Sequence, residues 1–381
     1  MMTKNSDPNS QAVQQLLTAL TKLPWMARVA LGALILLVVG VVYGMGCNNK
    51  APQTQPGDAT TTTFPAGSKS VVFCHWNMEN LFDDKDDKRR QPDEDYDAWF
   101  INKPEDRQAK YAKLAAWLVK QNNGIGPDVI VGNEIESARA AEMLQQALNA
   151  ALPADAVKYD YVAMKELDAG RHIAPCVVSR HPLSGAKLLG KRQRILEVHL
   201  AVNGHDLCLV ASHWTSQLTD KGTGKEGTGR DGYAHTIYEE FTEQLKANPK
   251  VDFLVCGDFN DTAESDSVAK TLHVVADPKL VTADANPPHL LGLLSGKSPE
   301  EFGTLYYNKP LIYDHIVVSP GLLDTTGWGC MVDTVSVPTE GLIRQGSKGR
   351  RPWRFGSAND NAVGRGFSDH FPVMVTLKVS P

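Results

Sequence analysis

Residues 252–261 read DFLVCGDFND. The stretch from Asp252 to Cys256 is apolar after its first residue, which is typical of a buried strand. Asp258 and Asn260 follow at the point where this strand ends. Alone, GDFN is compatible with an ordinary turn, because glycine and asparagine favour turns. The stretch becomes informative when it is compared with the other strand ends of the chain.

Polar residues stand at the ends of several other predicted strands. They follow strands 70–76, 129–132 and 206–212, or precede strands 315–319 and 372–379. They are Asn77, Glu79, Asn80, Glu134, His213, Asp314, Asp369 and His370. Active sites of sheet proteins are built from loops that meet at one edge of the strands. We therefore expect these side chains to converge.

Strands outnumber helices between residues 69 and 381. Helices are predicted at 104–122, 137–152 and 233–247, the first with proline in its first turn and the second with Ser137 as N-cap. Many strands with few helices predict an α/β protein with two packed sheets flanked by helices. Nothing marks a break in this region, so residues 69–381 are predicted to be one catalytic domain.

The N-terminal region has a different character. Residues 29–47 (VALGALILLVVGVVYGMGC) are uncharged and mostly apolar. As a helix they would reach roughly 28 Å, about the thickness of a bilayer core. Residues 48–68 are rich in Pro, Thr, Asn and Gln, which is typical of a flexible linker. The pattern predicts a transmembrane signal anchor over 29–47 rather than a buried core helix.

The flanking charges predict the orientation of this anchor. Lys4, Lys22 and Arg28 precede the span, and Lys50 is the nearest cation after it. The positive-inside rule then places residues 1–28 in the cytoplasm and the catalytic domain outside it, in a bacterial periplasm or at the cell surface. Residues 1–28 are long for a cleaved signal peptide. A lipoprotein anchored at Cys47 stays an alternative.

Composition excludes several classes of protein. Hydrophobic residues make up 42% and charged residues 22%, which excludes a collagen-like, wholly disordered or polytopic membrane protein. Six cysteines in 381 residues are too few for a disulfide scaffold. A net charge of −5 excludes a basic nucleic-acid coat protein. A polyanionic substrate would need local cations or a metal ion.

The set of strand-end residues suits one kind of chemistry. Carboxylates such as Glu134 are hard oxygen ligands for Mg²⁺ or Mn²⁺, and two histidines accompany them. The set needs neither a serine nor a cysteine nucleophile. It fits hydrolysis of a phosphate ester by water, with a metal ion neutralising the developing charge.

The ordered series WN-x-E, NE, SHW, GDFN, YDHI and SDH resembles the endonuclease/exonuclease/phosphatase superfamily, the DNase I-like proteins. The resemblance covers residues 70–379 and is closest in style to secreted bacterial nucleases. It implies a four-layer α/β sandwich with two central, mostly antiparallel sheets and helices outside. It also implies Mg²⁺-dependent (or Mn²⁺-dependent) cleavage of phosphoester bonds.

The resemblance implies metal-binding roles for four residues: Asn77, Glu79, Glu134 and Asp369. Glu134 matches the principal metal-binding glutamate of the superfamily. That glutamate usually follows Leu-Gln, whereas this chain has Gly132-Asn133. The departure keeps the ligand but shortens the neighbouring amide side chain.

The resemblance implies catalytic roles for five more residues. His213 matches a histidine that contacts the scissile phosphate. Asp258 and Asn260 match the pair that positions the attacking water and the phosphate. His370 matches the catalytic histidine, and Asp314 matches the carboxylate that orients it. Whether Asp258 or His370 is the general base stays open.

Basic and aromatic residues indicate the substrate. The loop 348–354 (KGRRPWR) contains Arg350, Arg351, Trp353 and Arg354, a combination that suits a phosphate backbone and a stacked base. Arg230 closes a glycine-rich stretch and is a further candidate for phosphate binding. We therefore expect a nuclease or related phosphodiesterase with a nucleic-acid substrate.

Two alternatives stay open at this point. One is a phosphatase or phospholipase C-type hydrolase that acts on lipid or sugar phosphates, which a membrane anchor would suit. The other is a non-catalytic binding module, although Glu134 and His370 are both retained. The sequence indicates no protein partner, and a monomer is expected.

Overall fold

The computed structural model describes residues 63–167, 170–217, 229–347, 349–360 and 364–381. The predicted cytoplasmic segment 1–28, the apolar span 29–47 and most of the linker 48–68 lie outside the described residues. In the described ranges, no helix combines the length and apolar character needed to cross a bilayer. The membrane anchor therefore stays a prediction.

The first of two large sheets has six strands in the order β14-β15-β1-β2-β4-β3. Their bounds are β1 (Lys69–Leu81), β2 (Val129–Ile135), β3 (Tyr161–Met164), β4 (Ala174–Ser179), β14 (Trp328–Ser336) and β15 (Val373–Val379). Strands β1 and β2 are parallel, and the other neighbours pair antiparallel. The carboxyl ends of β1 and β2 therefore lie at the same edge of the sheet.

The second sheet has seven strands in the order β5-β6-β7-β8-β13-β10-β9. Their bounds are β5 (Leu183–Leu188), β6 (Ile195–Val202), β7 (His205–His213), β8 (Phe253–Asp258), β9 (Val274–Val275), β10 (Leu290–Gly292) and β13 (Asp314–Val318). Strands β7 and β8 are parallel, as are β9 and β10. A separate hairpin joins β11 (Leu305–Tyr307) to β12 (Lys309–Leu311).

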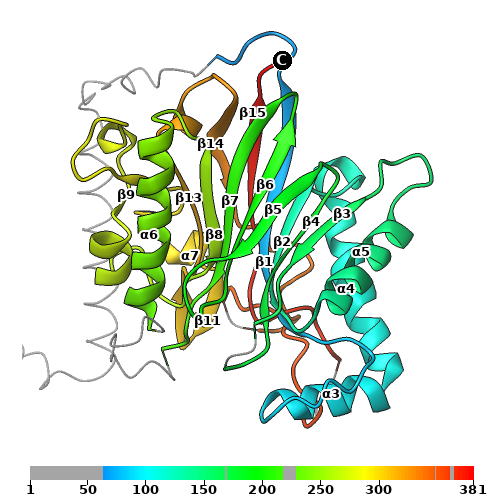
Figure 1. The fold of residues 1–381 in the computed structure, drawn as a ribbon. Helices are drawn as coiled ribbons and strands as arrows, with labels where there is room; N and C mark the ends of the chain where they lie inside the picture. Colours follow the sequence, from blue (N-terminus) through cyan, green and yellow to red (C-terminus); the bar gives the residue numbers. More distant parts are fainter. Residues whose placement is uncertain (1–62, 168–169, 218–228, 348, 361–363) are drawn as a thin grey trace, which may run out of the picture. The chain divides into compact units, whose positions relative to one another are not determined.

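Helices cover the outer faces of the two sheets (Figure 1). The longer ones are α4 (Pro104–Gly124) and α5 (Ala138–Ala151), which pack against the first sheet, and α6 (Arg230–Ala247), which packs against the second. The shorter ones are α3 (Asp93–Asn102), η2 (Asp266–Thr271), η3 (Pro278–Leu280), α7 (Pro299–Phe302) and η4 (Gly321–Leu323). The two sheets with helices outside agree with the expected α/β sandwich.

The helix ends follow the local sequence. The Ser137 side chain accepts a hydrogen bond from the backbone N–H of Ala140 at 2.9 Å, which confirms the predicted N-cap of α5. Pro104 opens α4, where its missing N–H costs nothing. Asn122 and Asn123 adopt left-handed backbone conformations and end the regular part of α4.

The first strand differs from its prediction, because β1 continues to Leu81 instead of ending at Trp76. Glu79 and Asn80 have φ angles of 50° and 56°, and the pairing of β1 with β2 shifts register between Asn77 and Leu81. An irregular strand of this kind does not show strict alternation of polar and apolar residues. That irregularity explains why the sequence pattern predicts a strand that ends at Trp76 and not at Leu81.

The described cysteines are buried and form no disulfide. Cys74, Cys176, Cys208 and Cys256 lie in strands, and together with Cys330 they are buried free thiols. A buried free thiol packs as a small apolar side chain. Cys47 lies outside the described residues.

Candidate active site

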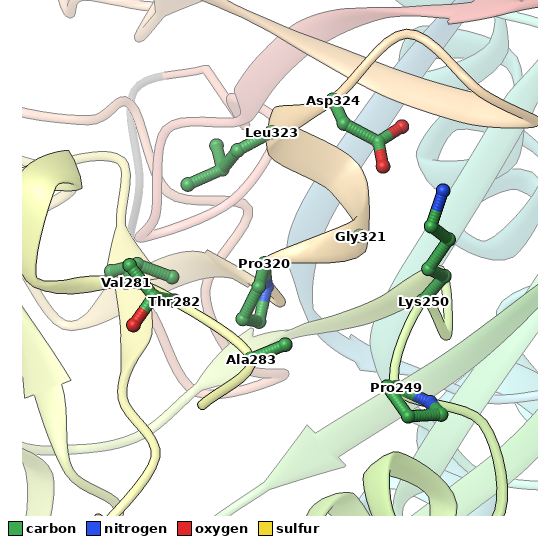
Figure 2. A pocket seen from close by; sticks show the side chains of 9 residues that line it. All are labelled: Pro249, Lys250, Val281, Thr282, Ala283, Pro320, Gly321, Leu323 and Asp324. Atoms are coloured by element: carbon green, nitrogen blue, oxygen red, sulfur yellow. The ribbon is translucent and has the colours of Figure 1, made fainter. Parts of the chain in front are cut away.

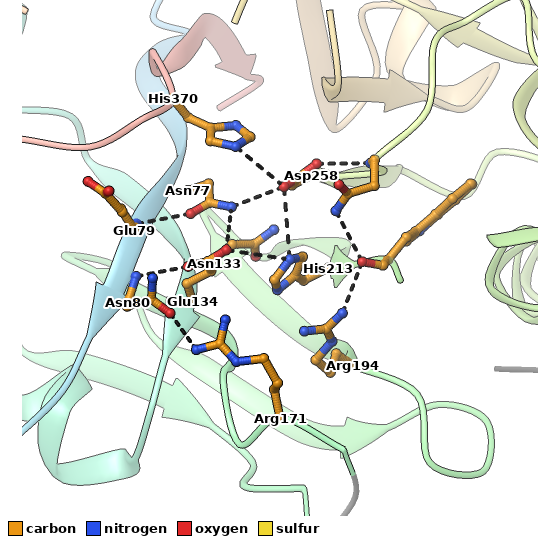
Figure 3. Close-up of polar contacts among 12 residues, drawn as sticks. Asn77, Glu79, Asn80, Asn133, Glu134, Arg171, Arg194, His213, Asp258 and His370 are labelled. Atoms are coloured by element: carbon orange, nitrogen blue, oxygen red, sulfur yellow. Dashed lines mark hydrogen bonds and ion pairs between the residues drawn. The ribbon is translucent and has the colours of Figure 1, made fainter. Parts of the chain in front are cut away.

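The predicted residues come from strands of both sheets that end at one edge of the sandwich. In the strand register, His213 of β7 lies opposite Asp258 of β8. Asp258 lies opposite Asp314 of β13, which runs antiparallel to β8. In β1 and β2, Asn77 pairs with Asn133. Because β1–β2 and β7–β8 are both parallel pairs, strand ends far apart in the sequence meet in space (Figure 3).

Asn77 connects the carboxylates at the centre of the site. Its Nδ2 donates to Asp258 Oδ2 at 3.0 Å and to Glu134 Oε1 at 3.3 Å. Its Oδ1 accepts the backbone N–H of Glu79 at 3.0 Å. The backbone N–H of Asn80 donates to Glu134 Oε2 at 2.9 Å. Asn77 thus links Glu134 of the first sheet to Asp258 of the second. The side-chain oxygen of Asn77 already accepts the hydrogen bond from Glu79.

Several of these residues have unusual backbone conformations. Glu134 and Asn260 have φ angles of 64° and 50°, and Asn80 lies in the same left-handed region. A non-glycine residue in this region is strained by roughly 1 kcal/mol or more. The strain coincides with register shifts in the β1–β2 and β2–β4 pairings. Such irregularities turn side chains out of the regular alternation, here toward the strand ends.

Asp314 is buried between two histidines. Its Oδ2 lies 2.7 Å from His370 Nδ1, and its Oδ1 lies 2.9 Å from His75 Nε2. Burial opposes ionisation of Asp314, but the charge and hydrogen bond of His370 and the hydrogen bond of His75 hold its pKa well below the usual range. Burial by itself lowers the pKa of His370. The charges of Asp314 and Asp258 outweigh burial and raise this pKa well above the usual value.

Asp258 lies within 4 Å of both predicted catalytic histidines. Its Oδ2 lies 3.7 Å from His370 Nε2 and 3.9 Å from His213 Nε2. Burial raises the pKa of Asp258 to about 7, and the charge of His370 opposes that rise. The backbone N–H of Asn260 donates to Asp258 Oδ1 at 2.9 Å. Asn260 Nδ2 donates to the carbonyl of Trp214 at 3.2 Å, so its side chain faces the same edge.

His213 is buried beside two carboxylates but is held neutral. Its Nε2 lies 3.9 Å from both Glu134 Oε1 and Asp258 Oδ2. Burial lowers the pKa of His213 well below the usual value, and the charges of Arg194 and Arg171 lower it further. A neutral imidazole there can donate to a phosphate oxygen or accept a proton.

Glu79 does not join the carboxylates around Glu134. Its Oε2 accepts the backbone N–H of Phe355 at 2.6 Å, and its Oε1 accepts Arg354 Nε at 3.0 Å and the backbone N–H of Gly356 at 3.2 Å. In Figure 3 its carboxylate points away from Glu134. Its contacts are those of an anchor for the loop that contains residues 354–356. Burial raises the pKa of Glu79 to about 7, and the charge of Asp369 contributes to the rise. Its role as a metal ligand stays a prediction.

Asp369 is the carboxylate that directly precedes His370 in the chain, and its side chain is half-buried. Burial raises the pKa of Asp369, and the negative charge of Glu134 contributes to the rise. Asp369 is thus electrostatically linked to Glu134, and its role as a metal ligand stays a prediction.

The predicted basic loop is largely attached to the protein body. The Arg350 guanidinium donates to the carbonyl of Val337 at 2.6 Å and to that of Glu301. Arg351 stacks over the ring of Tyr306 at 4.2 Å. These two arginines have structural contacts and are not placed near Glu134 or Asp258 by any described interaction.

The other predicted substrate residues also have partners. Trp353 Nε1 donates to the carbonyl of Gly364 at 3.2 Å. Arg230 Nε donates to Asp261 Oδ2 at 2.9 Å. Arg354 binds Glu79, and its charge opposes the raised pKa of Asp369. Of the five predicted substrate-binding residues, Arg354 is thus the one with an electrostatic link to the catalytic edge.

Two arginines that the sequence analysis did not single out flank the site. Arg171 Nη2 donates to Asn80 Oδ1 at 2.5 Å, and Arg194 Nη2 donates to the carbonyl of Trp214 at 2.9 Å. Figure 3 shows both guanidinium groups beside Glu134 and His213. Neither arginine belongs to a recognisable motif. Arg171 lies in the segment before β4, and Arg194 directly precedes β6. Only the fold brings them to the edge.

Asn133 was noted next to Glu134 but was given no role in the site, and His75 was not singled out. Asn133 Nδ2 donates to the carbonyl of Ser212 at 2.8 Å, which ties β2 to β7 across the two sheets. His75 lies inside the predicted buried strand SVVFCHW, whose pattern indicates core residues. A buried histidine in an apolar strand is a signal for a partner, because a buried ring nitrogen needs a hydrogen bond.

The donor set fits a hard divalent cation. Glu134 and Asp369 are partly exposed carboxylates, whereas Asp258 is buried. Mg²⁺ is commonly held by one or two carboxylates and completes its shell with water and phosphate oxygens. The cavity drawn in Figure 2, of about 340 Å³ between Pro249, Val281 and Pro320, includes none of these residues.

The fold and the site together define a class, that of two-sheet α/β hydrolases with a carboxylate and histidine site at one edge. The profile of the Endonuclease/Exonuclease/phosphatase family matches residues 71–379. The chain belongs to this family, which confirms the resemblance seen in the sequence. It is a hydrolase that acts on phosphoester bonds.

Several solved structures are similar to this chain at low identity. D. rerio TDP2 complexed with a single-strand DNA product is 14% identical, with a TM-score of 0.49, and the match covers 81% of this chain and 99% of that one. Beta toxin from Staphylococcus aureus with bound magnesium ions is 15% identical, with a TM-score of 0.46, over 82% of this chain and 100% of that one.

A third similar structure is an endonuclease/exonuclease/phosphatase family protein from Bacteroides thetaiotaomicron. It is 14% identical, with a TM-score of 0.46, and the match covers 82% of this chain and 99% of that one. No curated protein sequence matches this chain. At such low identity the structural matches concern the fold and not the substrate.

Proposed function

We propose that this hydrolase is a metal-dependent phosphodiesterase that cleaves nucleic-acid phosphodiester bonds by in-line attack of an activated water. The observation that carries the proposal is the joining of Glu134 and Asp258 through Asn77, beside the His370–Asp314 pair. Oxygen donors, a positioned imidazole and a buried carboxylate are the groups that phosphoester hydrolysis by water requires.

Glu134, with Asp369 beside it, would hold a Mg²⁺ or Mn²⁺ ion. The bound ion would neutralise the charge that develops on the phosphate oxygens. Asn77 and the backbone N–H of Asn80 fix the Glu134 carboxylate through hydrogen bonds of 3.3 and 2.9 Å. These contacts set the direction of the oxygens before any ligand arrives, which lowers the cost of ordering them.

Asp258 is the better candidate for general base. Its Oδ1 is fixed by the Asn260 backbone N–H, while its Oδ2 faces the interior of the site, 3.7 Å from His370 Nε2. His370 is held by Asp314 through Nδ1, so its Nε2 is the nitrogen directed at the reacting group. In this arrangement Asp258 accepts a proton from water, and His370 donates to a phosphate oxygen.

The surroundings of the site favour a nucleic-acid chain as the substrate. Arg171 and Arg194 flank the carboxylates and would neutralise a phosphate. The half-buried ring of Tyr96 lies 5.9 Å from the Arg171 guanidinium and stacks on Phe82 with centroids 5.3 Å apart. A cation next to an aromatic ring suits a phosphate followed by a stacked base.

The proposal is tested with the full chain and a panel of substrates. Plasmid DNA, single-stranded DNA, RNA, bis-p-nitrophenyl phosphate and sphingomyelin are each incubated with Mg²⁺, Mn²⁺ or EDTA. We expect cleavage of a nucleic acid that EDTA abolishes. Glu134→Gln should reduce the rate by a factor of roughly 10³ or more, since it removes the main oxygen ligand. Glu142→Gln, an exposed glutamate of α5, is the matched control.

Two outcomes would contradict this function. Cleavage that persists in EDTA would contradict the metal role of Glu134. Hydrolysis of sphingomyelin without cleavage of any nucleic acid would assign the site to lipid phosphates instead, which was the alternative considered from the sequence.

We also propose that the catalytic domain is tethered to a membrane and faces away from the cytoplasm. Support comes from the apolar residues 29–47 and the cations before them. Resistance of the full chain to alkaline carbonate extraction, together with protease access from outside the cytoplasm, would agree with this. A Cys47→Ala variant that releases the protein would favour lipid anchoring, whereas retention would favour a signal anchor.

A further inference from the structure

A second cluster of metal-ligating side chains lies on the second sheet, apart from the residues described above. It consists of Glu197 and His199 on β6 and Cys208 on β7, whose ligand atoms all lie within 4.8 Å of one another. We propose that this cluster is a zinc site, independent of the catalytic metal. The proposal does not depend on which phosphoester the enzyme hydrolyses.

The strand pairing places the three ligands together. His199 and Cys208 are direct partners in the antiparallel ladder of β6 and β7. Glu197 lies two residues before His199, and successive side chains alternate between faces, so it projects from the same face. Paired residues in such a ladder have Cβ atoms roughly 5 Å apart, which one ion can span. The cluster therefore rests on rigid sheet and not on a loop.

A neighbouring carboxylate fixes the histidine ring for metal binding. His199 Nδ1 lies 2.7 Å from Asp206 Oδ2, while Nε2 faces Glu197 Oε1 at 3.5 Å. A zinc-bound histidine usually donates its other N–H to a carboxylate, which fixes the tautomer and orients the ring. Asp206 has the position of that second carboxylate, and Nε2 is left directed at the cluster.

The cluster contains a buried oxygen that lacks a partner. Glu197 is 1% exposed, and its Oε2 has no hydrogen-bond partner among the described residues. Its Oε1 lies 3.0 Å from the Lys187 ammonium, which also lies 3.4 Å from Glu240 of α6. The Lys187 side chain is 49% exposed and can move into solvent. An unsatisfied buried carboxylate oxygen is costly, and a cation on it would remove that cost.

The ligand types select zinc over the hard cation of the catalytic site. Sulfur, imidazole and one carboxylate are ligands that zinc combines, whereas Mg²⁺ prefers oxygen alone. Cys208 is buried and His199 is partly accessible, so an ion would enter from the His199 side. Cys208 must lose its thiol proton, and a protonated His199 must lose its ring proton, so binding releases protons to solvent.

Cobalt titration of the full chain tests the site directly. Thiolate ligation of Co²⁺ gives a charge-transfer absorption in the near ultraviolet, and the catalytic residues include no cysteine that could produce it. We expect this absorption to saturate at one Co²⁺ per chain and to disappear when Zn²⁺ is added. Isothermal titration in buffers of different ionisation enthalpy should show about two protons released per Zn²⁺ at neutral pH.

Variants separate ligation from folding. Cys208→Ser should abolish the absorption, whereas Cys330→Ser, another buried free thiol, should retain it. Asp206→Asn should weaken Zn²⁺ binding about 10-fold, the usual effect of losing an outer partner of a ligating histidine. Lys187→Met should tighten binding, because it removes the competing ammonium. The partly exposed His199→Gln variant should fold and bind Zn²⁺ more weakly than the native chain.

The proposal would be overturned by the absence of a thiolate–cobalt absorption in the native chain. It would also be overturned if Cys208→Ser and Cys330→Ser behaved alike, or if His199→Gln bound Zn²⁺ as tightly as the native chain. A Glu134→Gln background removes the catalytic oxygen ligand. Persistence of the absorption in that background would therefore establish that the two metal sites are separate.

Discussion

At the scale of single residues, Asp314 shows how one buried carboxylate serves two elements. It receives one contact from His75 in β1 of the first sheet and one from His370, just before β15. Both oxygens of the carboxylate are thereby satisfied in an interior without water. The orientation of His370 therefore depends on a histidine that is itself remote from the substrate.

Replacing His75 tests this dependence. His75→Phe leaves Asp314 Oδ1 without its donor, and we expect it to destabilise the protein by about 1–3 kcal/mol. His75→Gln can still donate a hydrogen bond and should recover part of that loss. Unfolding free energies from denaturant titration would measure the difference. Equal stability of the two variants would show that the contact from His75 is unimportant.

Residues of the site were predictable wherever a local motif contained them. Asp258, Asn260 and His370 sit next to apolar strands, so their positions at strand ends follow from the sequence. Arg171 and Arg194 have no such neighbours, and their approach depends on how strands from distant parts of the chain pack. The family resemblance implied a metal-binding role for Glu79, but it could not reveal that Glu79 has a left-handed backbone and binds residues 354–356.

At the scale of elements, the loop that carries Arg354 is attached to β1 through Glu79. The buried carboxylate of Glu79 accepts two backbone N–H groups and one guanidinium N–H. The loop thereby gains a fixed position next to the catalytic edge. The contacts to Glu79 thus fix Arg354 in place, and its predicted role in substrate binding is untested.

A Glu79→Ala variant distinguishes an anchor from a metal ligand. We expect proteolysis within 349–360 to become faster and stability to fall by roughly 2–4 kcal/mol, because several charge-assisted hydrogen bonds are lost. Mg²⁺ affinity should be nearly unchanged. Glu134→Ala should give the opposite pattern, with weak metal binding and an intact loop. A large loss of Mg²⁺ affinity in Glu79→Ala would restore the original metal assignment.

Another element-scale contact joins β8 to β14 across the two sheets. Asp252 Oδ2 accepts the backbone N–H of Trp328 at 3.0 Å, and Asp252 Oδ1 is buried without a partner in the described part of the chain. Burial raises the pKa of Asp252 to about 7, which the hydrogen bond from Trp328 opposes. The folded protein therefore binds this proton more tightly than the unfolded chain does.

This shift predicts a pH-dependent stability. The contribution of Asp252 is fully present below the ordinary pKa of an aspartate and is lost as the pH rises through about 7. Asp252→Asn should be close to neutral at pH 4 and should stabilise the protein by about 1–3 kcal/mol at pH 8. Denaturant unfolding at the two pH values would measure it, with the exposed Asp160→Asn as control. A variant that is no more stable at pH 8 than at pH 4, relative to native, would refute the assignment.

At the scale of the whole molecule, the charge distribution limits how a polyanion can bind. The chain carries a net charge of −5, and among the described residues the partly exposed cations with an electrostatic link to the catalytic edge include Arg171, Arg194 and Arg354. Affinity for single-stranded DNA should therefore fall only gently with salt, with a slope of about −2 in log K against log salt. Filter binding by Glu134→Gln at several salt concentrations would measure it. A much steeper slope would indicate a larger basic surface.

The general architecture was predictable because alternating apolar strands and their turns are local signals. The pairing of six and seven strands into two sheets was not, since register depends on contacts between distant segments. Short edge strands such as β5, with its mostly exposed LSGAKL sequence, were missed for the same reason. Their alternation is too weak to stand out from a loop.

The bond from Asn77 Nδ2 to Asp258 Oδ2 crosses from one sheet to the other. Half of the catalytic groups thus belong to each layer, and neither layer alone carries a working set. A chain in which only one of the two sheets has formed would remain inert until the other sheet forms and docks against it. Hydrolytic activity accordingly requires the completed sandwich of two sheets. A partly folded chain would not hydrolyse phosphoesters.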